Sequence, residues 1–221
     1  MIVTIDGPSG TGKSTVAKKL ADRLGWVYFD TGALYRALSW QILRRQVPLT
    51  SSKAIEALLQ TFLFSVEKRN HREVYFVSGH DVTQAIRSPE VTAVVSQISA
   101  MKCVRSAMLP LQRNIAKRGS TVFEGRDLGT VVFPRAEVKF FLTASLEVRA
   151  KRRLEDLRRH FPSKQFDYET VLRTIDMRDT HDCKRELAPL KCAADAIVVD
   201  TSSLPIDGVV SILETQIKNI L

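Results

Sequence analysis

A glycine-rich segment near the start of the chain constrains the fold more than any other feature. Residues 7–14 read GPSGTGKS and match the pattern G-x-x-x-x-G-K-[ST] at every fixed position. The segment follows the β-branched run at residues 2–5, which has the composition of a buried strand. After it, Val16, Leu20 and Leu24 recur at helical spacing. The motif therefore stands between an expected strand and an expected helix.

A loop of this kind in this position is typical of a nucleoside triphosphate site (a P-loop). Its glycines let backbone N–H groups curl around phosphate oxygens, and the following helix points its positive end at them. Lys13 is expected to reach the β- and γ-phosphates, and the Ser14 hydroxyl to bind Mg²⁺. A dinucleotide fingerprint is rejected, because its third glycine position holds Thr15. The predicted triphosphate-binding residues are Gly7, Pro8, Ser9, Gly10, Thr11, Gly12, Lys13, Ser14 and Thr15.

Composition and charge are ordinary for a soluble globular protein with anionic partners. The chain has 221 residues, of which 44% are hydrophobic and 26% charged. These values predict one large domain, or a core with insertions, and argue against disorder. The formal net charge of +9 indicates an anionic partner, either nucleic acid or phosphorylated small molecules. Composition alone does not separate these two classes.

Cysteine usage and the start of the chain predict a cytoplasmic protein. Cys103, Cys183 and Cys192 form no C-x-x-C pair and have no zinc-type histidine spacing. Free thiols in a reducing cytosol are therefore expected. The chain opens directly on the expected strand, without a signal peptide, and no apolar run approaches ~18 residues, so no membrane partner is expected.

Short apolar runs that alternate with helical patterns predict an α/β fold. Continuous rather than alternating apolarity indicates a parallel sheet covered on both faces. Two stretches interrupt the pattern: residues 41–103, with a small antiparallel sheet expected around 63–67, 73–77 and a turn at 79–81, and the basic segment 149–185. Both are expected to close over the carboxyl edge of the sheet, where open α/β sheets bind ligands. The expected parallel strands are residues 2–5, 27–29, 121–123, 138–142 and 196–199.

Two polar segments follow expected strands. In DTGALYR, Thr31 is the predicted N-cap of a helix that carries Leu34, Leu38 and Ile42 inward. Arg36 lies on the first turns of that helix, near the ligand edge of the sheet, although a solvated arginine is the alternative there. In EGRDLGT, an Arg-Asp pair stands between two glycines directly after a strand, where ligand groups are expected. The alternative is an ion pair that only closes the turn.

The basic segment changes character along its length. Its first part, from Arg149 to about residue 159, has i,i+4 pairs at Arg152–Asp156 and Glu155–Arg159, so we interpret most of these arginines as a solvated helical face. In the next helix an apolar stripe, Tyr168, Val171 and Ile175, continues on the same face as Arg178, Asp182 and Arg185 at i, i+4, i+7 spacing. Such a stripe would bury charges unless it faced a polar cleft.

Four blocks of the sequence, IDGPSGTGKST, DTGALYR, EGRDLGTVVFP and RDTHDCKRELAPL, resemble the bacterial cytidylate kinase family in order and spacing across residues 5–190. The resemblance implies transfer of the γ-phosphate of ATP, with Mg²⁺, to CMP or dCMP in pyrimidine metabolism, by a monomer. It implies a P-loop NTPase three-layer fold with a central parallel five-stranded sheet. The core would comprise residues 1–40, 104–150 and 186–221, the NMP-binding insertion residues 41–103, and the lid residues 151–185.

The resemblance also implies a set of site residues. Arg36, Arg126 and Arg185 match phosphate-binding positions, and Arg178 and Asp182 match positions near the ribose. Cytosine offers an amine donor that a carboxylate such as Asp127 accepts, and acceptors suited to Arg105. The implied CMP-binding residues are Thr31, Arg36, Ser96, Arg105, Arg126, Asp127, Arg178, Asp182 and Arg185, and the implied catalytic residues are Lys13, Arg126, Arg178 and Arg185.

Two positions depart from the expected pattern. His181 stands where the family usually carries a further arginine, so no phosphate role is assigned to it. Pro110 lies inside the helix expected at residues 102–117, where it should kink or restart the helix and thereby affect the placement of Arg105.

Three other functions are alternatives to a cytidylate kinase for a chain with this loop. A regulatory GTPase would need an NKxD motif, and Asn70, Asn114 and Asn219 lie in no such context. A kinase for another nucleotide or for shikimate shares the P-loop and would be separated by a screen of acceptors. An ATPase that binds nucleic acid would use the positive charge, but the sequence has no basic-aromatic stacking platform. We therefore expect nucleotide substrates and no nucleic-acid partner.

Overall fold

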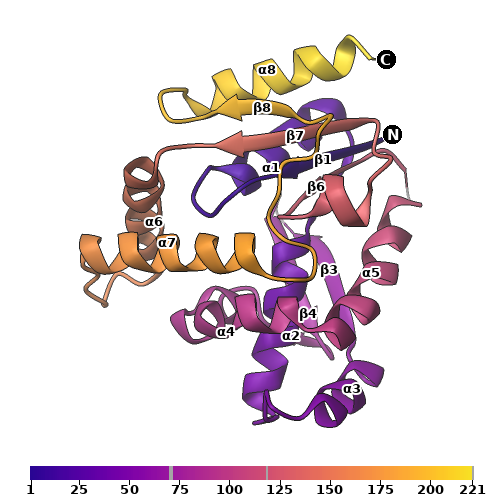
Figure 1. Ribbon diagram of the computed structural model, residues 1–221, viewed down its shortest axis with the longest axis vertical. Helices are drawn as coiled ribbons and strands as arrows, with labels where there is room; N and C mark the ends of the chain where they lie inside the picture. The colour runs from indigo at the N-terminus through magenta and orange to yellow at the C-terminus, as the bar shows by residue number, and fades with distance from the viewer. Residues whose placement is uncertain (70–71, 118, 221) are drawn as a thin grey trace. The chain divides into compact units, whose positions relative to one another are not determined.

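The computed structural model describes residues 1–69, 72–117 and 119–220. The chain divides into two compact units, Met1–Phe29 with Ile115–Leu221, and Asp30–Asn114. Most helices and strands of both units are labelled in Figure 1. We call them the P-loop unit and the insertion unit.

A five-stranded sheet forms the centre of the P-loop unit and confirms the predicted α/β class. Its strand order is β2-β6-β1-β7-β8, and the registered pairs of β1 with β6, β1 with β7 and β7 with β8 are all parallel. Each strand coincides with an expected apolar run, and no observed bound differs from the expected one by more than one residue. The strands are β1 (Ile2–Asp6), β2 (Val27–Asp30), β6 (Thr121–Glu124), β7 (Val138–Thr143) and β8 (Ile197–Asp200).

Apolar side chains cover both faces of this sheet. On one face, Val16 and Leu20 of α1 (Lys13–Leu24) and Leu213 of α8 (Ile206–Lys218) share a core cluster with residues of the strands. Neighbouring residues of a strand point to opposite faces. Accordingly, Val122 joins that cluster, whereas the ring of Phe123 lies 4.4 Å from Phe133 and 6.0 Å from Phe29, measured between centroids. This layered packing holds the carboxyl ends of the strands in place.

Two further helices of the P-loop unit have a small core of their own. These are α6 (Leu146–His160) and α7 (Tyr168–Lys184). A five-residue turn, η2 (Leu128–Val132), follows β6 and completes the elements of the unit. The α6–α7 cluster comprises the buried residues Ala150, Leu154, Leu157, Val171 and Ile175, with partly buried Leu146, Phe161, Phe166, Tyr168 and Leu172 packed against them.

The insertion unit combines helices with a small antiparallel sheet, as the strand-like runs in residues 41–103 predicted. The sheet has the order β3-β4-β5, with both pairs antiparallel. Its turn falls at Ser78 and Gly79, and His80 and Asp81 form the short last strand. The elements are α2 (Thr31–Arg44), α3 (Ser52–Gln60), β3 (Phe64–Arg69), β4 (Arg72–Val77), β5 (His80–Asp81), η1 (Ala85–Arg87), α4 (Pro89–Ala100) and α5 (Lys102–Ala116).

The start of α2 corrects one sequence prediction. Asp30, not Thr31, is the N-cap: its backbone is extended, and its carboxylate accepts a hydrogen bond from the Ala33 N–H at 2.9 Å. Thr31 is already helical and buried, so its hydroxyl does not occupy the capping position. The predicted inward face is confirmed, since Leu34, Leu38 and Ile42 are all buried.

Of the two effects expected of Pro110, a kink or a restart of the helix, the restart is wrong. The helix α5 runs as one element from Lys102 to Ala116 with Pro110 inside it. A proline in a helix removes one backbone donor. The burial of Val104, Met108 and Gln112 on one side of α5 stabilises the remaining helical turns, so Arg105 lies on a continuous helix.

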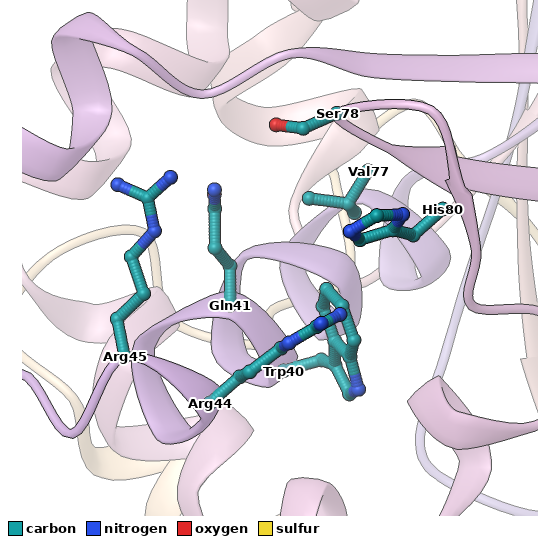
Figure 2. A pocket seen from close by; sticks show the side chains of 7 residues that line it. All are labelled: Trp40, Gln41, Arg44, Arg45, Val77, Ser78 and His80. Carbon is teal, nitrogen blue, oxygen red and sulfur yellow. The ribbon is translucent and has the colours of Figure 1, made fainter.

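The insertion unit also contains a cavity of about 230 Å³, shown in Figure 2. Arg44 and Trp40, both on α2, meet at its wall, with the guanidinium 5.0 Å from the ring centroid. None of the site residues predicted from the sequence lines this cavity, so it is distinct from the predicted site. The lining residues are Trp40, Gln41, Arg44, Arg45, Val77, Ser78 and His80.

Candidate active site

The glycine-rich loop connects β1 to α1 and can be built only with glycine at two of its positions. Gly7 and Gly10 have φ of 142° and 79°, a region that L side chains rarely adopt. A Cβ on Gly7 would lie 2.1 Å from the Leu142 carbonyl oxygen, and one on Gly10 would lie 2.9 Å from the Cβ of Arg149. The loop therefore packs directly on β7 and α6.

Lys13 folds back over this loop at the start of α1. Its Nζ donates to the Pro8 carbonyl at 2.6 Å and to the Thr11 hydroxyl at 3.4 Å. Burial, together with the nearby charge of Arg126, lowers the pKa of Lys13 below its ordinary value. Ser14, the next residue, is exposed on the first turn of the helix. Ser14 thus stands on an exposed turn, where a metal ion bound to phosphates would need a ligand.

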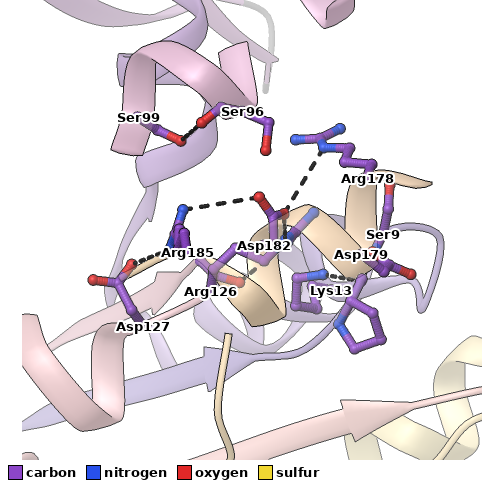
Figure 3. A network of polar contacts seen from close by, with 12 residues as sticks. Ser9, Lys13, Ser96, Ser99, Arg126, Asp127, Arg178, Asp179, Asp182 and Arg185 are labelled. Carbon is purple, nitrogen blue, oxygen red and sulfur yellow. Dashed lines mark hydrogen bonds and ion pairs between the residues drawn. The ribbon is translucent and has the colours of Figure 1, made fainter. Parts of the chain in front are cut away.

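Five charged residues that the sequence singled out meet in one cluster, which we call the arginine–carboxylate network: Arg126, Asp127, Arg178, Asp182 and Arg185 (Figure 3). Asp182 lies at its centre, with Oδ2 3.4 Å from Arg126 Nε and 4.0 Å from Arg178 Nε, and Oδ1 3.8 Å from Arg185 Nη1. Asp127 Oδ1 lies 3.5 Å from Arg185 Nη2. Three guanidinium groups thus share two carboxylates.

The network is buried and carries an excess of positive charge. The side chains of Asp182 and Arg185 are only 3% and 4% exposed. Burial, together with the nearby Arg126, lowers the pKa of Arg178 to about 10, so Arg178 stays protonated at neutral pH. Among the described residues, the buried Nε of Arg178 has no hydrogen-bond partner. An anionic ligand would supply the charge that the two carboxylates leave uncompensated.

The helix α7 brings three members of the network together. Val171 and Ile175 belong to the small core shared with α6, and Asp182 continues the buried side of the helix. Beyond the helix, Arg185 Nε donates to the Ala188 carbonyl at 2.5 Å, and the Leu190 N–H donates to the Asp182 carbonyl at 2.8 Å. The chain after α7 therefore holds the last arginine in position.

Asp6 connects the glycine-rich loop with the turn that carries Arg126 and Asp127. It is the last residue of β1, and its two carboxylate oxygens accept the N–H groups of Leu128 at 3.0 Å and Gly129 at 2.8 Å. Burial raises the pKa of Asp6 to about 6, against the opposing effect of these two hydrogen bonds. Sequence reasoning gave no role to Asp6, because its partners lie more than a hundred positions away.

Arg149 is an exception to the interpretation of most arginines of this basic segment as a solvated face, which Arg158 and Arg159 confirm by their exposure. It is buried, and its guanidinium pairs with Asp179 of α7 and donates to the Ser9 carbonyl at 3.2 Å. The two i,i+4 pairs expected nearby are replaced by other contacts. Arg152 donates to the Thr201 carbonyl at 2.6 Å, and Asp156 lies 4.0 Å from Arg159 at i,i+3. No local signal could have found these partners, which lie elsewhere in the chain.

Four of the residues implied for the CMP site lie in the insertion unit. Arg36 donates to the Thr92 hydroxyl at 2.8 Å and to the Ile86 carbonyl at 3.2 Å. Arg105 is buried beside the ring of Tyr35, with its guanidinium 5.9 Å from the ring centroid, and donates to the Ser99 carbonyl at 3.4 Å. The structure therefore gathers the predicted site residues into two groups, one in each unit; the insertion unit holds Thr31, Arg36, Ser96 and Arg105.

Residues 1–69, 72–117 and 119–220 include neither a membrane-spanning helix nor a cluster of metal-binding side chains. In this part of the chain no helix has the length and apolarity needed to cross a membrane. The same residues contain no cluster of three or more histidine, cysteine, aspartate or glutamate side chains arranged to hold a metal ion. Ser14 therefore remains the candidate metal ligand from the sequence.

A glycine-rich loop between a parallel strand and a helix, beside a buried group of arginines, defines a P-loop phosphotransferase of the α/β class. The family model described as cytidylate kinase matches residues 3–219, and the chain belongs to this family. It is 49% identical over 212 residues to the cytidylate kinase of Protochlamydia amoebophila (strain UWE25), covering 95% of this chain and 93% of that one. It is also 49% identical to the cytidylate kinase of Geobacillus sp. (strain WCH70), covering 94% and 92%.

A solved structure supports the same fold. The shikimate kinase of Bacteroides thetaiotaomicron superposes with a TM-score of 0.52 at 14% sequence identity, covering 99% of this chain and 98% of that one. At this level of identity the likeness concerns the fold alone, and it agrees with the layered parallel sheet described above.

Proposed function

We propose that this protein transfers the γ-phosphate of ATP to CMP or dCMP, giving CDP or dCDP and ADP. Membership of the cytidylate kinase family over residues 3–219 supports this function. The observation that carries it is the convergence of Arg126, Arg178 and Arg185 on Asp182 in the unit that also holds the glycine-rich loop. One unit thus offers a triphosphate loop together with a second, buried group of cations suited to phosphate.

ATP is proposed to bind through residues 7–15. The backbone N–H groups of the loop, other than that of Ser9, which is bonded to Asp179, and those at the start of α1 face the phosphates. Lys13 leaves the Pro8 carbonyl to pair with the phosphates. The exposed hydroxyl of Ser14 is the proposed protein ligand of Mg²⁺. When bound with ATP, this ion neutralises charge on the β- and γ-phosphates.

CMP is proposed to bind residues of both groups. Arg36, Arg126 and Arg185 take its phosphate, and Arg178 and Asp182 lie near its ribose. Asp127 accepts the exocyclic amine of cytosine, and Arg105 donates to the ring acceptors. Uracil presents an acceptor to Asp127 in place of that amine and is expected to bind less well. Thr31 and Ser96 complete the proposed CMP site.

The chemical step needs positioning and charge neutralisation, with no catalytic base. An oxygen of the CMP phosphate, already anionic, attacks the γ-phosphorus and forms the new P–O bond. The bond from that phosphorus to the β–γ bridging oxygen breaks, and its electron pair leaves with ADP. Lys13, Arg126, Arg178 and Arg185 stabilise the negative charge that spreads over the transferred group. Residues 151–185, as a lid, exclude water that would otherwise hydrolyse ATP.

A coupled assay of ADP formation with ATP, Mg²⁺ and each nucleoside monophosphate tests this function. We expect turnover with CMP and dCMP, less with UMP, and none with shikimate. Absence of turnover with CMP and dCMP would contradict the proposal. ATP hydrolysis stimulated by RNA or DNA in a salt-dependent manner would favour the nucleic-acid ATPase instead.

The proposed setting is a cytoplasmic monomer. Cys103, Cys183 and Cys192 are free thiols, which supports a reducing compartment. Light scattering on the purified protein tests the oligomeric state, and a mass twice that of the chain would contradict it.

A further inference from the structure

The peptide group of Ser9 in the glycine-rich loop is held on both sides by charged side chains. Its N–H donates to Asp179 Oδ1 at 3.1 Å, and its carbonyl accepts from Arg149 Nη1 at 3.2 Å. Arg149 and Asp179 also pair directly with one another. Figure 3 shows Asp179 on α7 beside Ser9, next to the members of the network on the same helix. The loop is thus joined to α6 and α7 through one backbone position.

This junction is buried and leaves little freedom to its members. The side chains of Arg149 and Asp179 are 10% and 13% exposed. Arg149 Nε also donates to the Ala144 carbonyl at 3.0 Å, and the Gly10 backbone packs against Arg149 so closely that a Cβ there would lie 2.9 Å from the Cβ of that arginine. A buried charge that loses its partner is strongly unfavourable. A shift of the loop at Ser9 therefore has to be followed by Asp179 or has to break a buried ion pair.

On α7, Asp179 follows Arg178 directly and stands one turn before Asp182. Residues adjacent in a helix point in different directions, so α7 presents Asp179 to the loop while Arg178 and Asp182 belong to the arginine–carboxylate network. Because Ser9 N–H is bonded to Asp179, it is not offered to a phosphate. The hydrogen bond from the Ser9 N–H to Asp179 instead sets the distance between the loop and α7, the helix that leads to the arginines of the network.

We propose that Asp179 is a positioning residue that couples ATP binding in the loop to CMP binding at the network, by tying the Ser9 peptide to α7. This inference rests on the proposed function. The loop conformation that holds the triphosphate fixes Ser9, Ser9 fixes Asp179, and α7 then presents Arg178 and Arg185 to CMP. Two sites linked in this way raise each other's affinity by the same factor, typically fivefold or more.

Calorimetry on the full chain tests the coupling. CMP is titrated into the protein alone and into the protein saturated with Mg²⁺ and the β,γ-imido analogue of ATP. For the wild type we expect the analogue to tighten CMP binding by at least about fivefold. In Asp179→Ala the ratio should fall to about one, while CMP affinity without the analogue stays within about twofold of the wild-type value. A variant that is merely less stable would not lose the effect of the analogue on CMP binding while keeping its CMP affinity in the absence of the analogue.

Two further variants sharpen the test. Asp176→Ala changes the same residue type on the same helix, three positions earlier and exposed, and should keep the wild-type ratio. Asp179→Asn keeps the shape and an acceptor for Ser9 N–H but loses the charge that pairs with Arg149, so an intermediate ratio is expected, and this variant serves if Asp179→Ala does not fold.

The proposal is overturned if the wild-type ratio is one, or if both Asp179 variants keep the wild-type ratio. The coupled assay separates this result from the function itself. A wild type that phosphorylates CMP while its Asp179 variants keep full coupling refutes only the positioning role. A wild type without CMP phosphorylation refutes the proposed function.

Discussion

The glycine-rich loop and the arginine–carboxylate network lie in the same unit and are both suited to phosphate, but they are specified in different ways. The loop uses backbone N–H groups and consecutive residues, and its shape depends on positions such as Gly7 and Gly10 that exclude a side chain. The network uses side-chain charges from the turn after β6 and from α7 and its C-terminal end. Apart from Lys13, a cradle made of backbone tolerates changes of charge but not of volume, whereas a cluster of charged side chains depends on charge more than on volume.

The largest effect is expected for Lys13→Ala, the one side chain on which the loop depends for charge. Removing it should lower kcat by about a thousandfold or more, because the charge on the transferred group loses a direct partner. The coupled assay measures the loss, and near-normal turnover would refute the mechanism. Lys19→Ala is the matched control. It removes an exposed lysine of the same helix as Lys13, which pairs with Asp207 of α8, and should leave kcat unchanged.

The second largest effect is expected for a change of side-chain volume in the loop. In Gly10→Ala the new Cβ meets Arg149 at a φ of 79°, so the loop has to move, and KM for ATP should rise by about 100-fold. Gly25→Ala has a similar φ of 67° but open space around the new Cβ. This control should destabilise the protein by about 1 kcal/mol and leave KM for ATP as it was. Equal effects of the two variants on ATP would contradict the packing argument.

A change of charge in the network should affect the other substrate. Asp127→Ala removes the proposed acceptor of the cytosine amine, and hydrogen bonds to charged groups contribute about 1.5–3 kcal/mol. KM for CMP should therefore rise by about 10- to 100-fold, with a smaller change in KM for ATP, as measured by steady-state kinetics. Asp207→Ala, at an exposed carboxylate, should change neither constant. An equal loss for both substrates would argue against a role in reading the base.

The smallest effect is expected at Asp6, which links the two regions. Its folded-state pKa of about 6 lies above the ordinary value of 3.8, so between these values the folded protein binds more protons than the unfolded one. The contribution of Asp6 to stability is therefore fully present below pH 3.8 and lost as pH rises through 6. Its size is of order 1–3 kcal/mol.

Urea unfolding between pH 4 and 7 tests whether the contribution of Asp6 to stability falls as pH rises. The free energy of unfolding of Asp6→Asn, relative to that of the wild type, should increase as pH rises, because asparagine does not titrate. A relative stability that is constant over this range would show that Asp6 has an ordinary pKa.

The difference between the two regions also explains what the sequence could predict. The loop and the positions of the five strands along the chain follow from contiguous patterns, which need no tertiary information, whereas the order of the strands in the sheet does not. Arg178 and Asp182 lie four positions apart on α7 and Arg185 is its C-cap residue, so the spacing that indicated a polar cleft does bring the three together, although Arg185 is not helical. Arg149 resembled its exposed neighbours in composition, and only the fold brings it to Ser9 across 140 positions.

Two other predictions concerned positions where opposing local effects are of similar size. Asp30 and Thr31 are adjacent and both are good N-caps, so the sequence alone could not decide which of them ends in the extended conformation. Pro110 lacks a donor, but the burial of one side of α5 outweighs that loss, and burial is a property of the tertiary structure.

The small core shared by α6 and α7 has a consequence for local stability. Its buried members are up to 9% exposed, and it has no residue in common with the core around the central sheet, where most side chains are at 0–2%. Less apolar surface is removed from water there, so this helix pair can lose its packing while the sheet remains intact. Its amide protons should accordingly exchange with deuterium sooner than those of β1 and β7, as expected of a unit with lower local stability.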